Sequence, residues 1–176
     1  MSPFITETAR LRARHIGPDD VDAMFEVYGD AEAMRWVDDG SPITRAECEH
    51  WIRVTLNNYE VRGYGMFALL DHESSEVVGF CGLVHPGGQT EAEIKYALKR
   101  KFWGKGFATE AVAALLPWGA DRLGIDHVIA TVAPENMASQ RVLLKAGMRA
   151  MGIRKNDDGS VTQMFGWRVS SIDADR

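Results

Sequence analysis

The pattern of apolar and polar residues changes its period several times along the 176-residue chain. Apolar residues recur at helical spacing in some segments, whereas others are short and rich in β-branched and aromatic residues. The first pattern predicts helices and the second predicts strands. In chain order we expect a strand at 11–15, helices at 21–28, 31–37 and 44–58, strands at 64–70, 76–84 and 92–98, a helix at 108–123, a strand at 127–132, a helix at 136–144, and strands at 152–154 and 161–169.

Capping and turn residues mark the ends of several of these elements. Asp19 predicts the N-cap of the first helix, and Thr44 with Glu47 predicts a capping box at the start of the third. Pro117 removes a backbone donor inside an apolar helix and crowds the preceding turn, so we expect a kink or an early end there. Gly147 predicts the end of the last helix. The order of elements predicts an α+β fold with a mixed, mostly antiparallel sheet.

Composition and charge narrow the class of protein. Apolar residues at 45% and charged residues at 26% are ordinary for a globular protein, and the length suits a single domain spanning 1–176. The formal net charge of −5 argues against nucleic-acid binding. Cys48 and Cys81 lack a zinc-site spacing, so we expect neither a metal nor a disulfide framework. No apolar run is long enough to span a membrane, and we expect a cytoplasmic protein without a membrane partner.

A basic turn with two close glycines carries the clearest functional signal. The segment 93–110, EIKYALKRKFWGKGFATE, predicts a strand, a turn containing Gly104 and Gly106, and the first turns of a helix. Glycine lets a backbone approach a ligand closely, and the unpaired N–H groups and positive dipole end of the helix point back at the turn. Together these features predict an anion site, most simply for the phosphates of a cofactor. Glycines needed only for tight packing are the structural alternative.

Two other nucleotide-binding motifs do not fit this segment. A dinucleotide fingerprint beginning at Gly104 would need a third glycine where Thr109 stands, and Asp126 precedes the next strand instead of ending it. A P-loop would need a Gly-Lys-Ser/Thr sequence, which is absent. The residues alone therefore predict an anion site without naming its ligand.

Three ordered motifs resemble the GNAT superfamily of N-acetyltransferases, in the branch that contains the ribosomal-protein-alanine N-acetyltransferases. The segment 103–111, WGKGFATEA, resembles the acyl-CoA pyrophosphate loop of the superfamily. The segments 8–14, TARLRAR, and 136–148, NMASQRVLLKAGM, are similar to the opening strand and the late helix of the branch. The departures from the family pattern are Ala13, Trp103 and Met148. The resemblance covers nearly the whole chain and implies a GNAT-like three-layer α+β domain, with helices flanking the central sheet.

The resemblance also implies acetyl-CoA as the co-substrate. Backbone N–H groups of the loop would hold its pyrophosphate, and the pantetheine arm would pair with the strand at 92–98 like an added strand. The residues assigned to the cofactor are Tyr96, Ala97, Leu98, Trp103, Gly104, Lys105, Gly106, Phe107, Ala108, Thr109, Asn136 and Ser139. Asn136 would hydrogen-bond the arm, although a plain N-cap also explains it. Four basic residues would steer the anionic cofactor, with a solvated basic loop as the simpler explanation for most of them: Lys99, Arg100, Lys101 and Lys105.

Acetyl transfer to an amine needs a base, an oxyanion donor and a proton for the leaving thiolate. Glu93 is the predicted base, directly or through water, and a strand-end carboxylate facing solvent is the alternative. The resemblance implies that a backbone N–H near Leu98 stabilises the oxyanion. Leu143 stands where many family members have a Tyr, which leaves Ser139 as the predicted source of the thiol proton or as a simple helix cap. His85 is a further candidate for proton transfer near neutral pH.

The motifs do not identify the acceptor. The resemblance places it between 34–40 and 64–70, while Lys95 and Ala97 stand where the branch often has Gly and Trp. A protein N-terminus, an amino acid, a polyamine and an aminoglycoside-like drug all agree with these motifs. We expect an acetyl-CoA-dependent N-acetyltransferase that acts on a primary amine by direct attack, as a monomer or a homodimer. A non-catalytic acyl-CoA-binding module and a nucleotide-phosphate binder are the alternatives.

Overall fold

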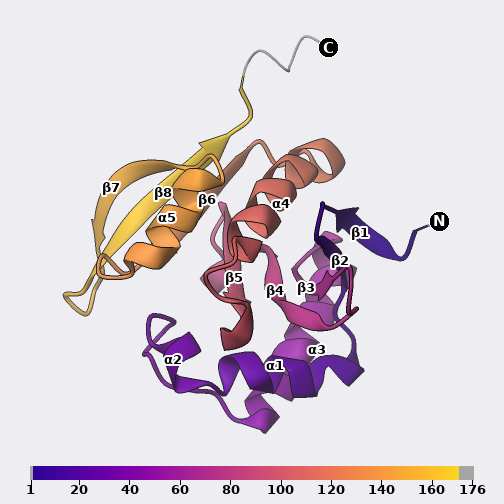
Figure 1. The fold of residues 1–176 in the computed structure, drawn as a ribbon. Coiled ribbons are helices and arrows are strands. Elements are labelled where there is room, and N and C mark those ends of the chain that lie inside the picture. Colours follow the sequence, from indigo (N-terminus) through magenta and orange to yellow (C-terminus); the bar gives the residue numbers. More distant parts are fainter. Residues whose placement is uncertain (1, 171–176) are drawn as a thin grey trace.

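An eight-stranded mixed sheet organises the computed structural model, which describes residues 2–170 (Figure 1). In sheet order the strands are β1 (Phe4–Glu7), β2 (Leu11–His15), β3 (Met66–Asp71), β4 (Val77–Val84), β5 (Ala92–Leu98), β6 (His127–Val132), β8 (Val161–Arg168) and β7 (Arg149–Lys155). The helices are α1 (Val21–Tyr28), α2 (Ala31–Met34), α3 (Arg45–Arg62), α4 (Phe107–Leu123) and α5 (Met137–Lys145). Neighbouring strands pair antiparallel, except β5 and β6, which pair parallel. The predicted α+β fold with a mixed, mostly antiparallel sheet is confirmed.

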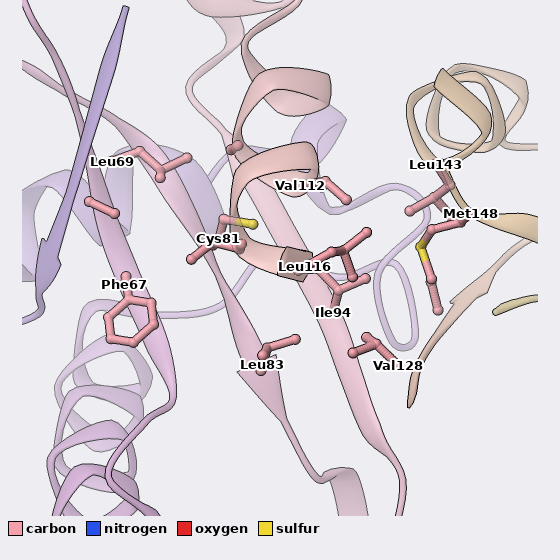
Figure 2. Packing of buried hydrophobic residues seen from close by; sticks show 14 of the residues in the cluster. Phe67, Leu69, Cys81, Leu83, Ile94, Val112, Leu116, Val128, Leu143 and Met148 are labelled. Atoms are coloured by element: carbon pink, nitrogen blue, oxygen red, sulfur yellow. The ribbon is translucent and has the colours of Figure 1, made fainter. Parts of the chain in front are cut away.

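Helices cover both faces of this sheet and form three layers, with α4 and α5 on one face and α1 to α3 on the other, where they lie at the bottom of Figure 1. Apolar side chains of α4 pack against β3, β4, β5 and β6 in one core cluster, which Leu143 and Met148 join from the end of α5 (Figure 2). A second cluster on the other face joins Val27 of α1 and Ile52 of α3 to Phe80 of β4. The sheet is therefore buried on both faces along its centre, where β4 and β5 lie.

Strands β5 and β6 diverge soon after they meet. They pair only at Ala92 with Val128 and at Glu93 with Ile129. From Glu93 to Leu98, β5 stays paired with β4, and β6 stays paired with β8 over its full length. From residue 94 onward, β5 therefore has no strand beside it on its β6 side, and a gap opens within the sheet. We call this space the β5–β6 gap.

Two helix ends differ from the sequence predictions. α3 continues to Arg62, past the expected end near residue 58, because Gly63 is the first residue with a left-handed φ, 81°. α2 ends at Met34 instead of residue 37. The capping box at the start of α3 and the glycine that ends α5 are confirmed.

Two local predictions about helices meet a different outcome. Of the kink or early end expected at Pro117, the early end does not occur, since α4 runs on to Leu123. The buried Leu115 and Leu116 before the proline and the partly buried Trp118 after it hold the helix against the core. Asp19 is not the N-cap of α1, because Asp20 occupies that position. The buried Asp20 carboxylate pairs with Arg14 of β2 at 2.8 Å, so tertiary structure selects one of two adjacent acids.

Strands at the two edges of the sheet are the ones that the sequence pattern predicts poorly. β1 is not predicted, because four residues are too few to establish a period. β7 covers 149–155 instead of 152–154, and all its residues are exposed, including Met151 and Ile153, so no buried face sets its apolar pattern. β3 begins at Met66, two residues later than expected. Pairing with a neighbouring strand, which the local sequence does not record, creates both edge strands.

Gly82 of β4 lies against the backbone of β3, so an added methyl group would overlap it. A Cβ there would lie 2.5 Å from Met66 Cα and 2.8 Å from the carbonyl carbon of Gly65. We predict that Gly82→Ala lowers the free energy of unfolding by about 2 kcal/mol or more, as measured by urea denaturation. Gly17→Ala is the control, because no atom lies within 4 Å of its Cβ position. Equal stability changes in the two variants would contradict the prediction.

Candidate active site

The glycine turn and the start of α4 present a continuous row of backbone donors. Gly104 and Gly106 have φ values of 70° and 81°, in the left-handed region that glycine adopts most easily. An added Cβ at Gly104 would meet no atom within 4 Å, so tight packing does not explain this glycine. Within residues 2–170, no acceptor takes a hydrogen bond from the N–H groups of 104–109, and the first helix bond runs from Glu110 N–H to the Gly106 carbonyl. This arrangement has the shape and polarity of an anion site.

Of the four basic residues in and before the glycine turn, three are already paired with carboxylates. The side chain of Lys99 is only 9% exposed, and its ammonium lies 3.0 Å from Glu26. The other two pairs are Arg100 with Asp30 and Lys101 with Glu76. The solvated loop expected for these residues is therefore wrong for Lys99. In the described part of the chain, Lys105 has no carboxylate within 4.0 Å, which leaves its ammonium available to an anionic ligand.

Backbone groups of β5 face the β5–β6 gap at alternate residues. The N–H of Lys99 donates to the Val78 carbonyl of β4 at 2.9 Å. Because antiparallel pairs alternate, the backbone groups of Ala97 also point to β4, whereas those of Tyr96 and Leu98 point into the gap. The expectation that Ala97 offers its backbone to the pantetheine arm is therefore wrong. An extended ligand in the gap would meet the backbone of Tyr96 and Leu98 instead.

Trp103 ties the glycine turn to the end of β5. Its indole Nε1–H donates to the Leu98 carbonyl at 2.9 Å, across the short 3-10 turn Arg100–Phe102. The indole thereby satisfies one of the carbonyls that face the gap. Trp103, one of the departures from the family pattern, thus stabilises the shape of the turn.

Two hydroxyl groups meet where α5 approaches β5. Asn136 Oδ1 accepts a hydrogen bond from the Ser139 N–H at 3.2 Å, which confirms its predicted role as the N-cap of α5. Ser139 Oγ lies 2.5 Å from the hydroxyl oxygen of Tyr96. Burial raises the pKa of Tyr96 to about 12, although the hydrogen bond with Ser139 opposes the rise, so the phenol stays protonated at neutral pH. Leu143 is 1% exposed and points into the core (Figure 2).

Glu93 is buried where the β5–β6 gap begins. Its side chain accepts hydrogen bonds from the hydroxyl of Thr131 on β6 and from Gln89 Nε2 at 3.3 Å. It is only 3% exposed, so the alternative of a carboxylate facing solvent is wrong. Because side chains alternate along a strand, Glu93 and Tyr96 lie on opposite faces of β5. The two residues predicted to be catalytic, Glu93 and Ser139, therefore flank the gap from opposite faces of the sheet.

His85 lies one residue beyond β4, which places it beside the end of the strand that pairs with Glu93. Its Nδ1 is 3.0 Å from the Gln89 carbonyl, an acceptor, so Nδ1 must carry the proton. In the neutral ring, Nε2 then accepts from the Tyr64 hydroxyl at 2.7 Å. Gln89 contacts His85 through its backbone and Glu93 through its side chain. This network orients Glu93 and was not predicted from the sequence.

A second unpredicted cluster supports the glycine turn. The carboxylate of Glu110, in the first turn of α4, lies 2.7 Å from Thr8 Oγ1 and 2.7 Å from Arg10 Nε. Thr8 and Arg10 precede β2, and all three residues belong to the segments that resemble the family motifs. The family motifs thus include the residues of this cluster. Their contact cannot be predicted from the sequence, because about a hundred residues separate the partners.

Comparison with known proteins identifies the family. The family model described as "Acetyltransferase (GNAT) domain" matches residues 10–149. This chain belongs to the GNAT acetyltransferases. It is 30% identical over 151 residues to "Uncharacterized N-acetyltransferase p20" of Bacillus licheniformis, which covers 85% of this chain and 84% of that protein. The GNAT fold, the N-acetyltransferase activity and the use of acetyl-CoA are therefore those predicted from the motifs, and the non-catalytic alternative is not supported.

Solved GNAT structures share this fold. One is "the acetyltransferase (GNAT family) from Bacillus anthracis", with a TM-score of 0.79, 24% identity, and coverage of 92% of this chain and 96% of that one. Another is RimL, described as a ribosomal L7/L12 α-N-protein acetyltransferase in complex with coenzyme A. It has a TM-score of 0.79 and 20% identity, and the match covers 94% of this chain and 98% of that one. At these identities the likeness shows the fold.

Two kinds of feature are absent from residues 2–170. In this part of the chain, no helix has both the length and the apolar character needed to cross a membrane. No group of three or more His, Cys, Asp or Glu side chains there is arranged to hold a metal ion.

Proposed function

We propose that this GNAT enzyme acetylates a primary amine that enters on the Glu93 face of β5, while acetyl-CoA lies in the β5–β6 gap. The observation that carries the proposal is the end of the β5–β6 pairing at Glu93, because it places a buried carboxylate at the mouth of the gap. The gap leads along β5 to the unpaired N–H groups of the glycine turn. Acetyl-CoA supplies the acetyl group as an activated thioester.

Each part of the gap suits a different part of the cofactor. The N–H groups of 104–109 and the positive end of α4 bind the diphosphate, and Lys105 adds a full positive charge. The backbone groups of Leu98 and the Tyr96 carbonyl pair with the pantetheine arm as a strand would. The Tyr96 N–H, which also faces the gap, suits the developing oxyanion, because it lies closer to Glu93 than Leu98 does, which is five residues or about 16 Å away along the strand. Asn136 and Ser139 approach the arm from the start of α5.

Glu93 is the proposed base. A protein N-terminal amine has a pKa of about 8 and a lysine amine one of about 10.4, so either must lose a proton before it attacks. The hydrogen bonds from Thr131 and Gln89 hold the Glu93 carboxylate in place, so that it can accept this proton directly or through one water. His85 and Tyr64 lie behind Gln89 and fix its position.

The hydroxyl pair Tyr96–Ser139 is the proposed source of the proton for the leaving thiolate. Leu143 fills the core, so the helix position that holds a Tyr in many relatives supplies no hydroxyl here. Tyr96 brings a protonated phenol to Ser139 from β5 instead. Either hydroxyl can donate its proton to the leaving thiolate. The other hydroxyl then donates a hydrogen bond to the oxygen that has lost its proton.

Lys95 favours an acceptor that carries a single positive charge. It is exposed, although it belongs to a central strand, and it lies on the same face as Glu93. Two residues along a strand separate the two positions by about 7 Å. A polyamine or aminoglycoside would bring a second cation toward the Lys95 ammonium. We therefore place a protein N-terminus first among the acceptors, which is the acceptor class in the printed description of RimL.

The acceptor assignment predicts the outcome of a CoA-release screen. Peptides beginning with Ala or Ser should give kcat/KM values at least about tenfold above those of spermidine or an aminoglycoside, because charge repulsion of roughly 1.4 kcal/mol corresponds to that factor. Lys95→Glu should narrow the difference in kcat/KM between peptide and polyamine, because it raises the value for the polyamine. A wild-type preference for the polyamine would contradict the acceptor proposal, and the absence of turnover with any amine would contradict the proposed function.

The role of Glu93 predicts a loss of turnover without a loss of cofactor binding. Glu93→Gln should lower kcat/KM for the amine by about a hundredfold, since general-base catalysis contributes on that order. The Kd for CoA, measured by calorimetry, should stay within about twofold. Glu91→Gln is the matched control, because Glu91 is an exposed carboxylate just before the same strand. Turnover of Glu93→Gln within tenfold of wild type would exclude this role.

The hydroxyl pair predicts non-additive kinetics. Tyr96→Phe and Ser139→Ala should each lower kcat by about tenfold, and the double variant should be little worse than the slower single variant, because residues that act as a unit are not additive. Ser160→Ala, in the turn between β7 and β8, serves as the control. Independent, multiplying effects would show that the two hydroxyls do not act together. Wild-type kcat in both single variants would exclude them as proton donors.

A further inference from the structure

Contacts from the turn between β1 and β2 hold the glycine turn from outside. Arg10 makes an ion pair with Glu110 at 2.7 Å, and its backbone N–H donates to the same carboxylate at 2.9 Å. Arg10 Nη1 donates to the Lys105 carbonyl at 2.8 Å. Its guanidinium carbon lies 4.2 Å from the centre of the Phe107 ring. The proposed chemistry uses none of these contacts, yet they all converge on the loop assigned to the cofactor.

The contact with the Lys105 carbonyl sets the direction of a donor. The Lys105 carbonyl and the Gly106 N–H belong to one peptide unit, and in a trans peptide the two groups point in opposite directions. No cis peptide bond occurs in the described residues. Arg10 therefore turns the Gly106 N–H away from itself, toward the side of the turn that lacks a partner. Gly106 has no side chain to restrict its own conformation, so the external contact supplies this restraint.

Arg10 also neutralises a charge that would oppose an anionic ligand. Glu110 lies in the first turn of α4, one turn from the row of unpaired N–H groups. Burial raises the pKa of Glu110, but hydrogen bonds from Thr8 and Arg10 outweigh it, so the pKa lies below its ordinary value and the group is ionised. An unpaired carboxylate here would repel a diphosphate. The ion pair with Arg10 removes most of this repulsion.

We propose that Arg10 is a positioning residue for cofactor binding: together with Glu110 and Thr8, it orients the Lys105–Gly106 peptide toward the diphosphate and neutralises the carboxylate beside it. This inference rests on the proposed assignment of the glycine turn to the diphosphate of acetyl-CoA. The turn between β1 and β2 is then part of the cofactor site, although none of its residues needs to touch the cofactor.

The test compares acetyl-CoA with S-acetylpantetheine, which carries the thioester but lacks the diphosphate. Arg10→Gln should raise KM for acetyl-CoA by about ten- to a hundredfold, the range expected for charge-assisted hydrogen bonds, with kcat within about threefold. Its kcat/KM for S-acetylpantetheine should match that of wild type. An equal loss with both substrates would overturn the role of Arg10. A wild-type enzyme that does not distinguish the two substrates would instead overturn the assignment of the loop.

A double variant separates positioning from simple loss of stability. Arg10→Gln leaves Glu110 charged and unpaired, so adding Glu110→Gln should recover at least about threefold of the lost acetyl-CoA affinity. A purely structural role predicts that the second substitution brings no recovery, and this result would contradict the proposal. Arg10→Lys keeps the charge but not the planar fork that reaches two acceptors, and it should bind acetyl-CoA with intermediate affinity. Arg10→Lys also provides the measurement if Arg10→Gln does not fold.

Arg14 offers a matched control on the neighbouring strand. It pairs with Asp20 through two hydrogen bonds, at 2.8 and 2.9 Å, and does not contact the glycine turn. Arg14→Gln should lower the Tm while leaving KM for acetyl-CoA within about twofold. If Arg14→Gln raised this KM as much as Arg10→Gln does, general destabilisation would explain both effects, and the positioning role would be wrong.

Discussion

The divergence of β5 from β6 is the constraint on which the site depends. A strand in the middle of a sheet normally has its backbone groups paired on both sides, and unpaired groups are costly when water is excluded. Beyond Glu93 the side of β5 that faces β6 has no strand partner. One carbonyl there is satisfied by the Trp103 indole. The remaining groups suit an extended ligand with alternating donors and acceptors, so binding of pantetheine would complete the sheet.

The chemistry around the gap follows from this geometry. The two faces of β5 carry different groups, because successive side chains point in opposite directions. One face holds Glu93 with its hydrogen-bonded support, and the other holds the hydroxyls of Tyr96 and Ser139. An acyl group in the gap would thus have a proton acceptor on one side and a proton donor on the other. The sheet itself separates the two functions, so neither group can neutralise the other.

In the proposed site, electrostatic attraction for the cofactor would come mainly from the backbone. The chain carries a formal charge of −5, and most of the basic residues before the glycine turn are held in ion pairs. Oriented N–H groups and the dipole of α4 remain, together with Lys105. The influence of such fixed dipoles is short in range and falls off within the first turn of the helix. Their effect depends on the direction in which the N–H groups point. Contacts that fix this direction, such as that between Arg10 and the Lys105 carbonyl, are therefore important.

Local pattern was sufficient for most helices and central strands, and for the glycine turn. Apolar period, capping residues and left-handed glycines act within a few residues, so they can be read from the sequence, and the family motifs add the cofactor. Contacts between distant segments determined the other features. They form the edge strands β1 and β7, and they place Asp20 instead of Asp19 at the N-cap of α1. They also allow α4 to continue past Pro117. Such contacts bury Glu93 beside Thr131, turn the Ala97 backbone away from the gap and join Arg10 to Glu110. These features depend on which distant segments meet, and no local period encodes that choice.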